Sequence, residues 1–302
     1  VLLLDEPDAH LEILRQRQIY QVLTETAAET GSQIIAASHS EVILNEAADR
    51  DMVIAFVGKP HRIDDRGSHV SKALKEIGFE HYMQAEETGW VLYLEGSTDL
   101  AILSSFAAKL DHPARQVLER PFVHYVGNQW PKAQAHFYGL REAKQDLVGV
   151  ALYDRIEGKA PKDDPNLRQM IWRRREIENY LCQEATLLAW AEAQGQRQHG
   201  DLFARSWSEA MTRSIADLIP PIARREPKHE WWANTKASDD FLDQLFKRFY
   251  VGELKLPNLM RKTDYHTLAH HVSIDEIDDE VREKLDTIAD VAKRASPSGV
   301  GV

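Results

Sequence analysis

Residues 91–103, VLYLEGSTDLAIL, constrain the fold of this chain more than any other stretch. Their apolar start predicts a short buried strand that ends at Glu95. Gly96 permits a sharp turn, Ser97 is placed to cap the next helix, and Asp99 falls in that helix's first turn. Open α/β sheets carry their chemistry at the carboxyl ends of the strands, so both acids are expected at one crevice. Carboxylates held this way repel each other unless a proton or cation lies between them, which suggests Mg²⁺.

The same pattern occurs again farther along the chain. Residues 147–153, LVGVALY, predict a strongly apolar strand that delivers Asp154 at its carboxyl end. The alternation of strands and helices over this region predicts a small doubly wound sheet, so the fold class is α/β. A parallel sheet flanked by helices would therefore bring Asp154 to the edge where Glu95 lies.

A later segment, residues 170–181 (MIWRRREIENYL), adds more charge. If it is extended around Ile177, its period of two places Glu176 and Glu178 on one face. Three arginines precede these acids and are candidates for phosphate binding: Arg173, Arg174 and Arg175. The alternative is a solvated, self-paired run of charges. The neighbouring carboxylates favour a site for metal and phosphate.

The first residues, VLLLDEPDAHLE, also predict a buried strand that ends in acids. Asp5 is suited to hold the Mg²⁺ of a nucleotide and Glu6 to orient an attacking water. A helix and a second apolar strand follow, and that strand ends in Ser38-His39-Ser40. The order of these elements resembles the Walker B, D-loop and switch-histidine segments of ABC-type ATPases. The resemblance implies that Asp8 is the D-loop residue and His39 the sensor of the γ-phosphate.

A complete nucleotide site needs more than these segments. The phosphate-binding GxxxxGK[ST] loop does not occur in the 302 residues, nor does the signature that such ATPases place across a dimer. The chain begins inside an expected strand without methionine, which indicates a piece of a longer protein. ATP is therefore expected as a cofactor only with the missing part, and the full-length protein is expected to be a homodimer through the ATPase lobe.

Composition limits the remaining possibilities. The chain is 43% hydrophobic and 28% charged, and it has no apolar run long enough for a membrane span. Its single cysteine, Cys182, fits a reducing cytoplasm. The net charge of −11 argues against a generally basic DNA-coating surface, but a nuclease with an acidic metal site remains possible.

The acidic residues of the second region resemble a known motif set. A glutamate with an aspartate four residues later, then a strand-end aspartate 55 positions on, is similar to the Toprim fold of topoisomerases, primases and nucleases. A Toprim domain directly after an ABC lobe, followed by REIENYL, resembles class 2 of the OLD (overcoming lysogenisation defect) nucleases. This resemblance covers essentially the whole chain. It implies an ATPase part over residues 1–88, a Toprim core over 89–184 and a mainly helical region over 185–302.

The resemblance also implies a DNA endonuclease that uses two divalent ions, Mg²⁺ or Mn²⁺. Glu95 and Asp99 match the first Toprim motif, Asp154 the second, and Glu176 with Glu178 the late glutamate pair. The second motif usually reads Asp-x-Asp, whereas Arg155 and Ile156 follow Asp154 here. Either Glu157 supplies the missing acid or nothing does. The family's late lysine corresponds to Lys236 or Lys262; Lys236 is favoured for catalysis and Lys262 for phosphate binding.

The last third of the chain shows apolar residues at helical spacing. A stripe of Ile277, Val281, Leu285 and Ile288 predicts a final helix over residues 274–292. His266 and His270 share a helix face, but no third ligand follows with the spacing of a zinc site. Zinc is therefore not favoured.

Three other functions fit parts of the pattern. One is a topoisomerase or primase activity on the same fold, although no tyrosine stands out as a nucleophile. Another is an ATP-gated DNA-binding clamp with a vestigial acidic cluster, which the broken Asp-x-Asp motif supports. RNA in place of DNA is the third.

Overall fold

The structure is a computed structural model that describes residues 1–48, 50–56, 60–62, 77–156, 158, 161–226 and 229–298. It is a mixed α/β protein, as the sequence predicts. The chain divides into two compact units. Unit 1 comprises Val1–Trp90, Gln134–Leu147 and Ala295–Val302, and unit 2 comprises Val91–Ala133 and Val148–Arg294. The domain boundaries predicted at residues 88 and 184 stay predictions.

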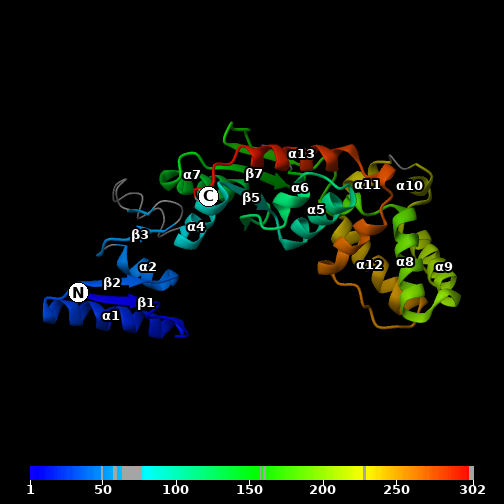
Figure 1. Ribbon diagram of the computed structural model, residues 1–302. Helices are drawn as coiled ribbons and strands as arrows, with labels where there is room; N and C mark the ends of the chain where they lie inside the picture. The colour runs from blue at the N-terminus through cyan, green and yellow to red at the C-terminus, as the bar shows by residue number, and fades with distance from the viewer. Residues whose placement is uncertain are drawn as a thin grey trace. The chain divides into compact units, whose positions relative to one another are not determined.

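Unit 1 contains two small sheets and several helices (Figure 1). Strand β1 pairs in parallel with β2, with Asp5 opposite Ala37, and β3 pairs antiparallel with β4. The elements of this unit are β1 (Leu2–Asp5), α1 (Ile13–Thr30), β2 (Ile34–Ala37), α2 (Glu41–Ala47), β3 (Ile54–Ala55), β4 (His61–Arg62), α4 (Phe79–Thr88) and most of α7 (Trp130–Ala143).

Local sequence explains where these helices begin and end. Helix α1 stops at Gly31, which adopts a left-handed conformation (φ +61°) that costs glycine little. Helix α2 begins after Ser40, whose hydroxyl accepts the N–H of Ile43 at 3.2 Å. Gly89 ends α4 at φ +71°, and a Cβ there would lie 2.7 Å from the backbone nitrogen of Ser296. A side chain at position 89 is therefore excluded by both conformation and space.

Unit 2 is built on one four-stranded sheet of order β6-β5-β7-β8. Strand β5 pairs in parallel with β6, and β7 in parallel with β8. The described side chains of β5 are all buried, and those of β7 are buried except at its first residue. Burial on both faces explains why these strands read as continuous apolar runs. The strands are β5 (Trp90–Leu94), β6 (Val123–Tyr125), β7 (Val148–Tyr153) and β8 (Leu167–Ile171).

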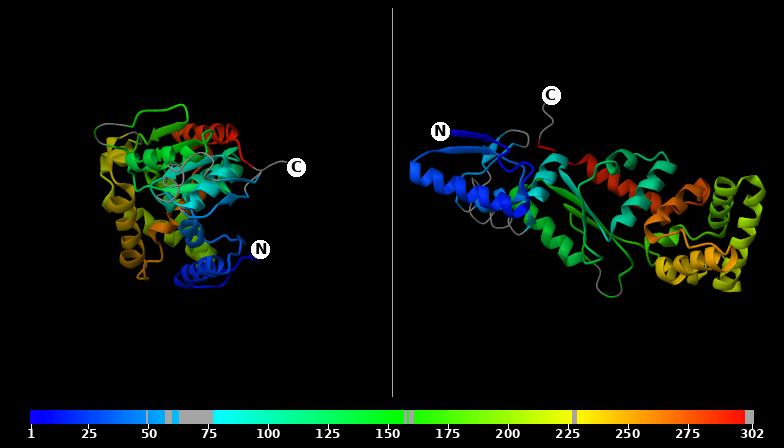
Figure 2. Two further views of the ribbon diagram at one scale, coloured as in Figure 1. Left: turned by 90° about the vertical axis from the view of Figure 1, so that its left-hand side faces the viewer. Right: turned by 90° about the horizontal axis from the view of Figure 1, so that it is seen from below.

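Helices cover this sheet and form a helical region beyond it. Helix α13 packs on β7, α5 and α6, as Figure 2 shows from two directions, while α8 and α9 pack on each other. These elements are α5 (Ser97–Lys109), α6 (Ala114–Leu118), η2 (Ile177–Tyr180), α8 (Glu184–His199), α9 (Asp201–Leu218), α10 (Pro221–Arg225), α11 (Glu230–Asn234), η3 (Ala237–Leu242), α12 (Asp243–Lys247), η4 (Arg248–Glu253), η5 (Lys262–His271), η6 (Ile274–Glu276) and α13 (Asp279–Lys293).

The final helix begins later than its apolar stripe predicts. Residues 274–276 form a separate short 3₁₀ turn, η6, and α13 starts at Asp279. The reason is a cap, because the carboxylate of Asp278 accepts the N–H of Glu280 at 3.0 Å. The predicted start at residue 274 is therefore wrong by one turn.

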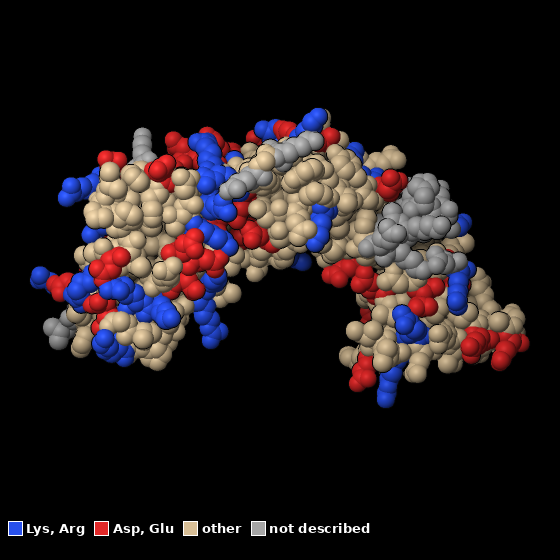
Figure 3. All heavy atoms as spheres, turned by 180° about the vertical axis from the view of Figure 1, so that it is seen from behind, with Lys and Arg blue, Asp and Glu red and all other residues tan. Residues whose placement is uncertain are grey.

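Two surface properties bear on possible partners. Among the helices that the structure describes, none combines the length and apolar character that crossing a bilayer demands. On the face of unit 2 drawn in Figure 3, the described basic and acidic side chains are intermingled over the helical region. That face therefore carries both signs of charge, in a chain whose net charge is −11.

Candidate functional site

The first two predicted acids lie at the junction of β5 and α5. Glu95 follows the last residue of β5 and is exposed, whereas Asp99 is buried in the first turn of α5. The N-cap is Gly96 rather than Ser97, which corrects the capping expected from sequence. Instead, Asp99 Oδ2 accepts the backbone N–H of Glu95 at 3.2 Å. This bond fixes the Asp99 carboxylate beside the end of the strand.

Asp154 reaches the same place from the neighbouring strand. It follows Tyr153, the last residue of β7, and β7 lies next to β5 in the sheet. The carboxyl groups of Asp154 and Glu95 interact, and this interaction raises the pKa of Asp154. Like charges have therefore been brought close together here.

Glu176 and Glu178 also enter this group, but not as an extended segment. Glu176 has extended backbone angles and caps η2, a 3₁₀ turn that contains Glu178, so the prediction of a strand with both acids on one face is wrong. The physical reason is Asn179, whose Oδ1 accepts the N–H of Glu176 at 2.9 Å and closes the turn. Both glutamates are buried, at 4% and 8% exposure.

Burial and mutual repulsion raise the proton affinity of these acids. The pKa of Asp99 is raised to about 7, first by burial and then by the charge of Glu95. The pKa of Glu178 is raised to about 8 by burial, and by the charges of Glu176, Asp99 and Glu95. Burial is also the first cause of the raised pKa of Asp154, followed by its interaction with Glu95. Five carboxyl groups from three distant segments thus share one electrostatic environment.

The two candidate lysines meet at a single carboxylate. Lys236 Nζ lies 2.5 Å from Asp239 Oδ2, and Lys262 forms an ion pair with the other oxygen of Asp239. The charges of Glu176 and Glu95 also raise the pKa of Lys236, after the larger effect of its bond to Asp239. The pKa of Lys262 is raised by Asp239 and Asp243. Of the two lysines, Lys236 is therefore the one coupled to the acidic group.

Backbone contacts hold the segment of Lys236 against the acids. Glu176 Oε1 accepts the N–H of Ser238, and Asn179 Nδ2 donates to the carbonyls of Trp232 and Thr235 at 2.9 Å each. The π-helical turn η3 begins directly after Lys236. Turns of this kind interrupt regular helices and are frequent at functional sites.

The position of the second acid in the Asp-x-Asp pattern is occupied by Ile156. Arg155, which stands between Asp154 and Ile156, donates to Asn234 Oδ1 at 2.8 Å and to the carbonyl of Ala233 at 3.3 Å. Arg155 therefore anchors the end of α11. The proposed substitute, Glu157, lies outside the described residues.

The predicted phosphate-binding arginines are engaged elsewhere. Arg173 pairs with Glu280 and Glu283 of α13, at 3.7 and 2.5 Å. Arg174 pairs with Asp278 at 2.8 Å and lies over the ring of Tyr180. The backbone N–H of Arg175 donates to the carbonyl of Ala233 at 2.8 Å. The structure thus places Arg173 and Arg174 in ion pairs at α13, and their binding of phosphate stays a prediction.

Sequence reasoning missed two residues that shape the site. Asn179 joins η2 to the segment of Lys236, and its position three residues after Glu176 is a capping signal. Glu280, with 1% exposure, accepts the N–H of Arg173 at 2.9 Å and the hydroxyl of Tyr180. Nothing in the local sequence distinguishes Glu280 from the other acids of its helix, so only the tertiary structure reveals it.

The residues of the ATPase-like segment lie together in unit 1. Glu6 follows β1 with a left-handed backbone (φ +44°), and its carboxylate lies 3.3 Å from His39 Nε2. Asp8 is buried and accepts the hydroxyl of Ser38 at 2.7 Å. Asp5 ends β1, opposite Ala37 of β2. The acidic residues that follow β1 thus lie beside the Ser38-His39 segment that follows β2.

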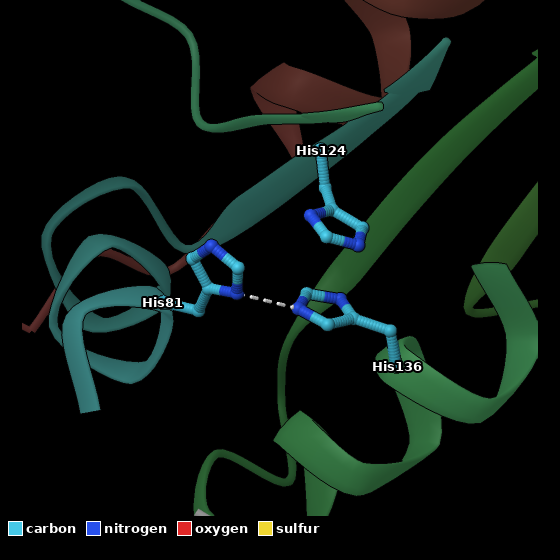
Figure 4. A group of neighbouring side chains, drawn as sticks. All are labelled: His81, His124 and His136. Atoms are coloured by element: carbon cyan, nitrogen blue, oxygen red, sulfur yellow. Dashed lines mark hydrogen bonds between the residues drawn. The ribbon is translucent and has the colours of Figure 1, made fainter. Parts of the chain in front are cut away.

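Unit 1 also contains a pair of facing imidazoles. His81 on α4 and His136 on α7 are joined by a hydrogen bond of 2.9 Å between Nδ1 and Nε2 (Figure 4). Their rings meet edge to face, with centroids 4.9 Å apart. A neutral imidazole has one donor and one acceptor nitrogen, so the bond fixes complementary tautomers on the two rings.

The donor set of the acidic group fits hard divalent ions. Carboxylate oxygens are the ligands that Mg²⁺ and Mn²⁺ prefer. The raised pKa values of Asp99, Asp154 and Glu178 show that the group lacks compensating positive charge. A bound cation would supply that charge and lower these pKa values.

One comparison with known proteins gives a match. Residues 1–45 match the family model described as "AAA domain, putative AbiEii toxin, Type IV TA system". No curated protein matches the chain. The N-terminal segment is therefore similar to part of an AAA-type ATPase domain. The roles of Asp5, Glu6, Asp8 and His39 stay predictions.

Proposed function

We propose that this chain carries a metal-dependent DNA endonuclease site on a Toprim-like sheet, of the OLD nuclease type. The observation that supports it best is the gathering of five acids, in which the charges of Glu95, Asp99 and Glu176 raise the pKa values of their neighbours. The five are Glu95, Asp99, Asp154, Glu176 and Glu178. Such crowding of acids costs free energy unless cations neutralise it, and it is a common signature of functional sites.

In this proposal the five carboxylates hold two divalent ions, Mg²⁺ or Mn²⁺. When bound, such ions activate water and stabilise the charge of the leaving oxygen in phosphodiester hydrolysis. Lys236 balances the negative charge of the scissile phosphate, since its ammonium group is already coupled to Glu176 and Glu95. The exposure of Glu95 leaves the acidic group accessible to a nucleic acid strand.

The test is plasmid nicking with Mg²⁺ or Mn²⁺. We expect Glu95→Gln and Asp154→Asn each to reduce the nicking rate at least about 100-fold, because each removes a metal ligand. Asp290→Asn is the matched control, since Asp290 is an exposed acid of α13 that pairs with Lys293 of the same helix. Full activity in either ligand variant would refute the assignment.

The replacement of the second motif acid by Ile156 favours one competing function, a DNA-binding clamp whose acidic group no longer binds metal. Calorimetry with Mn²⁺ separates the two, because the nuclease site requires binding that Asp154→Asn abolishes. Absence of binding in the unmodified chain, together with retained DNA binding, would support the clamp. In the full-length protein we propose that an ABC-type ATPase, paired as a homodimer, is coupled to this site.

A further inference from the structure

A cavity of about 360 Å³ lies in the helical region of unit 2. Its walls come from α8, η4, the segment before η5, and η5 itself. None of the five carboxyl groups of the candidate nuclease site contributes to the lining. Its volume lies in the range of pockets that hold small molecules.

One side of this cavity is aromatic and apolar. Trp190 and Tyr250 are buried at 3% and 2% exposure, with ring centroids 6.4 Å apart in an edge-to-face arrangement. Met260 is also buried, whereas Leu259 is 54% exposed, so an apolar wall faces outward beside the rings. This wall can cover the flat or apolar body of a ligand.

The aromatic side also holds a polar group without a partner. Trp190 Nε1 is buried and has no hydrogen-bond acceptor among the described residues. Buried indole N–H groups usually have a hydrogen-bond acceptor, and the described residues provide none for this donor. A ligand or a water in the cavity would provide one.

The lining also contains a guanidinium and two imidazoles. Arg197 of α8 and His270 and His271 of η5 belong to it, and Lys109 Nζ donates to the carbonyl of His270 at 2.5 Å. The pKa of His271 is lowered by burial and then by its neighbours His270, Lys109 and Arg197, so His271 is neutral at pH 7. Arg197 therefore supplies a positive charge to the cavity, and His271 supplies a neutral imidazole that can donate a hydrogen bond.

The acid of the described lining is Asp264, and it has partners of its own. Its Oδ2 accepts the backbone N–H of Arg261 at 3.2 Å, and its Oδ1 lies 3.4 Å from the hydroxyl of Thr263. Arg197 Nη2 donates to Gln194 Oε1 at 2.5 Å, which orients the guanidinium within the lining. Guanidinium groups have five donors, so further donors stay available for an anion.

We propose that this cavity binds a phosphate monoester carried on a planar or apolar body, with the phosphate at Arg197 and His271 and the body at Leu259 and Met260. A nucleoside monophosphate has this chemistry and fits the volume. The same group occurs free in solution and at the 5′ end of a DNA strand. The proposal does not depend on the nuclease assignment, because the five acids take no part in it.

The first experiment is calorimetry on the 302-residue chain in EDTA, which leaves the acidic site without metal. We expect AMP to bind at least 10-fold more tightly than either adenosine or inorganic phosphate. Only AMP has both a phosphate for Arg197 and a planar body for the apolar wall. Oligonucleotides with and without a 5′ phosphate then distinguish the sources. Binding that requires the 5′ phosphate indicates a strand end, and binding of AMP alone indicates a free nucleotide. No binding of AMP or of the phosphorylated strand at millimolar concentration would overturn the proposal.

Substitutions locate the binding in this cavity. Arg197→Gln and His271→Gln should each weaken AMP binding at least 10-fold, whereas Arg205→Gln should leave it unchanged. Arg205 is the matched control because it lies on α9, outside the cavity lining, and its side chain is 89% exposed. Its described partner is Glu209, one turn along the same helix. Thermal melting confirms that each variant is folded. Equal loss in Arg205→Gln, or unchanged binding in Arg197→Gln, would contradict the proposal while leaving the nicking test of Glu95 and Asp154 unaffected.

Discussion

At the scale of single residues, the raised pKa values of the acids govern how the metal-free protein responds to pH. The pKa of Asp99 is raised to about 7 and that of Glu178 to about 8. An acid whose pKa is raised on folding contributes stability below its unfolded pKa, and this contribution is lost as the pH rises through the folded value.

The metal-free protein should therefore become less stable between about pH 4, near the unfolded pKa values of these acids, and about pH 8. We expect its melting temperature in EDTA to fall by on the order of 5 °C over this range. Asp99→Asn and Glu178→Gln should flatten the dependence, because neither side chain can ionise. Differential scanning calorimetry at several pH values measures this. An equally steep fall in both variants would contradict the link to these acids.

The same scale separates the two candidate lysines. Lys236 is coupled to Glu176 and Glu95, whereas the charges that act on Lys262 are those of Asp239, Asp243 and Lys236. We expect Lys236→Ala to reduce nicking about 100-fold and Lys262→Ala about 10-fold or less, because only Lys236 lies in the field of the metal ligands. Steady-state nicking rates test this. A larger loss for Lys262→Ala would reverse the assignment.

At the scale of elements, hydrogen bonds to Glu280 hold α13 against the connection between β8 and η2. Its carboxylate is almost fully buried and accepts from the Arg173 N–H and the Tyr180 hydroxyl. Removing it takes the acceptor away from the Arg173 N–H and from the buried Tyr180 hydroxyl, which costs about 3 kcal/mol in the free energy of unfolding. Glu280→Ala should therefore lower stability by about that amount in urea denaturation.

The control for this prediction is the acid one turn farther along the same helix. Glu283 pairs with Arg173 but is 58% exposed at its side chain, and exposed ion pairs contribute little. Glu283→Ala should change the free energy of unfolding by less than about 0.5 kcal/mol. Equal effects of the two substitutions would show that α13 is not held through Glu280.

At the scale of the whole molecule, the ATPase-like segment holds only part of a nucleotide site. Asp5, Glu6 and His39 are adjacent, but the sequence has no GxxxxGK[ST] loop to hold the phosphates. We expect the 302-residue chain to release no phosphate from ATP, and to show no ATP binding that Glu6→Gln weakens. Equilibrium dialysis with labelled ATP and a phosphate-release assay check this. Hydrolysis lost in Glu6→Gln would contradict it.

The sequence by itself determined the α/β class and the strands that present Glu95 and Asp154. Buried parallel strands require continuous apolar runs, and such runs can be recognised in the amino-acid sequence. It also showed Glu6 and His39 directly after two apolar segments, and the parallel pairing of β1 with β2 then brings the two side chains together.

Only the tertiary structure decided how the remaining groups meet. The turn at Glu176 and Glu178 depends on Asn179 and on its bonds to the segment before Lys236, which lies more than 50 residues away. The partners of Arg173 and Arg174 come from α13, about 100 residues farther along the chain. The periodicity of a local segment cannot predict such contacts, because they depend on which distant helix packs beside a given turn.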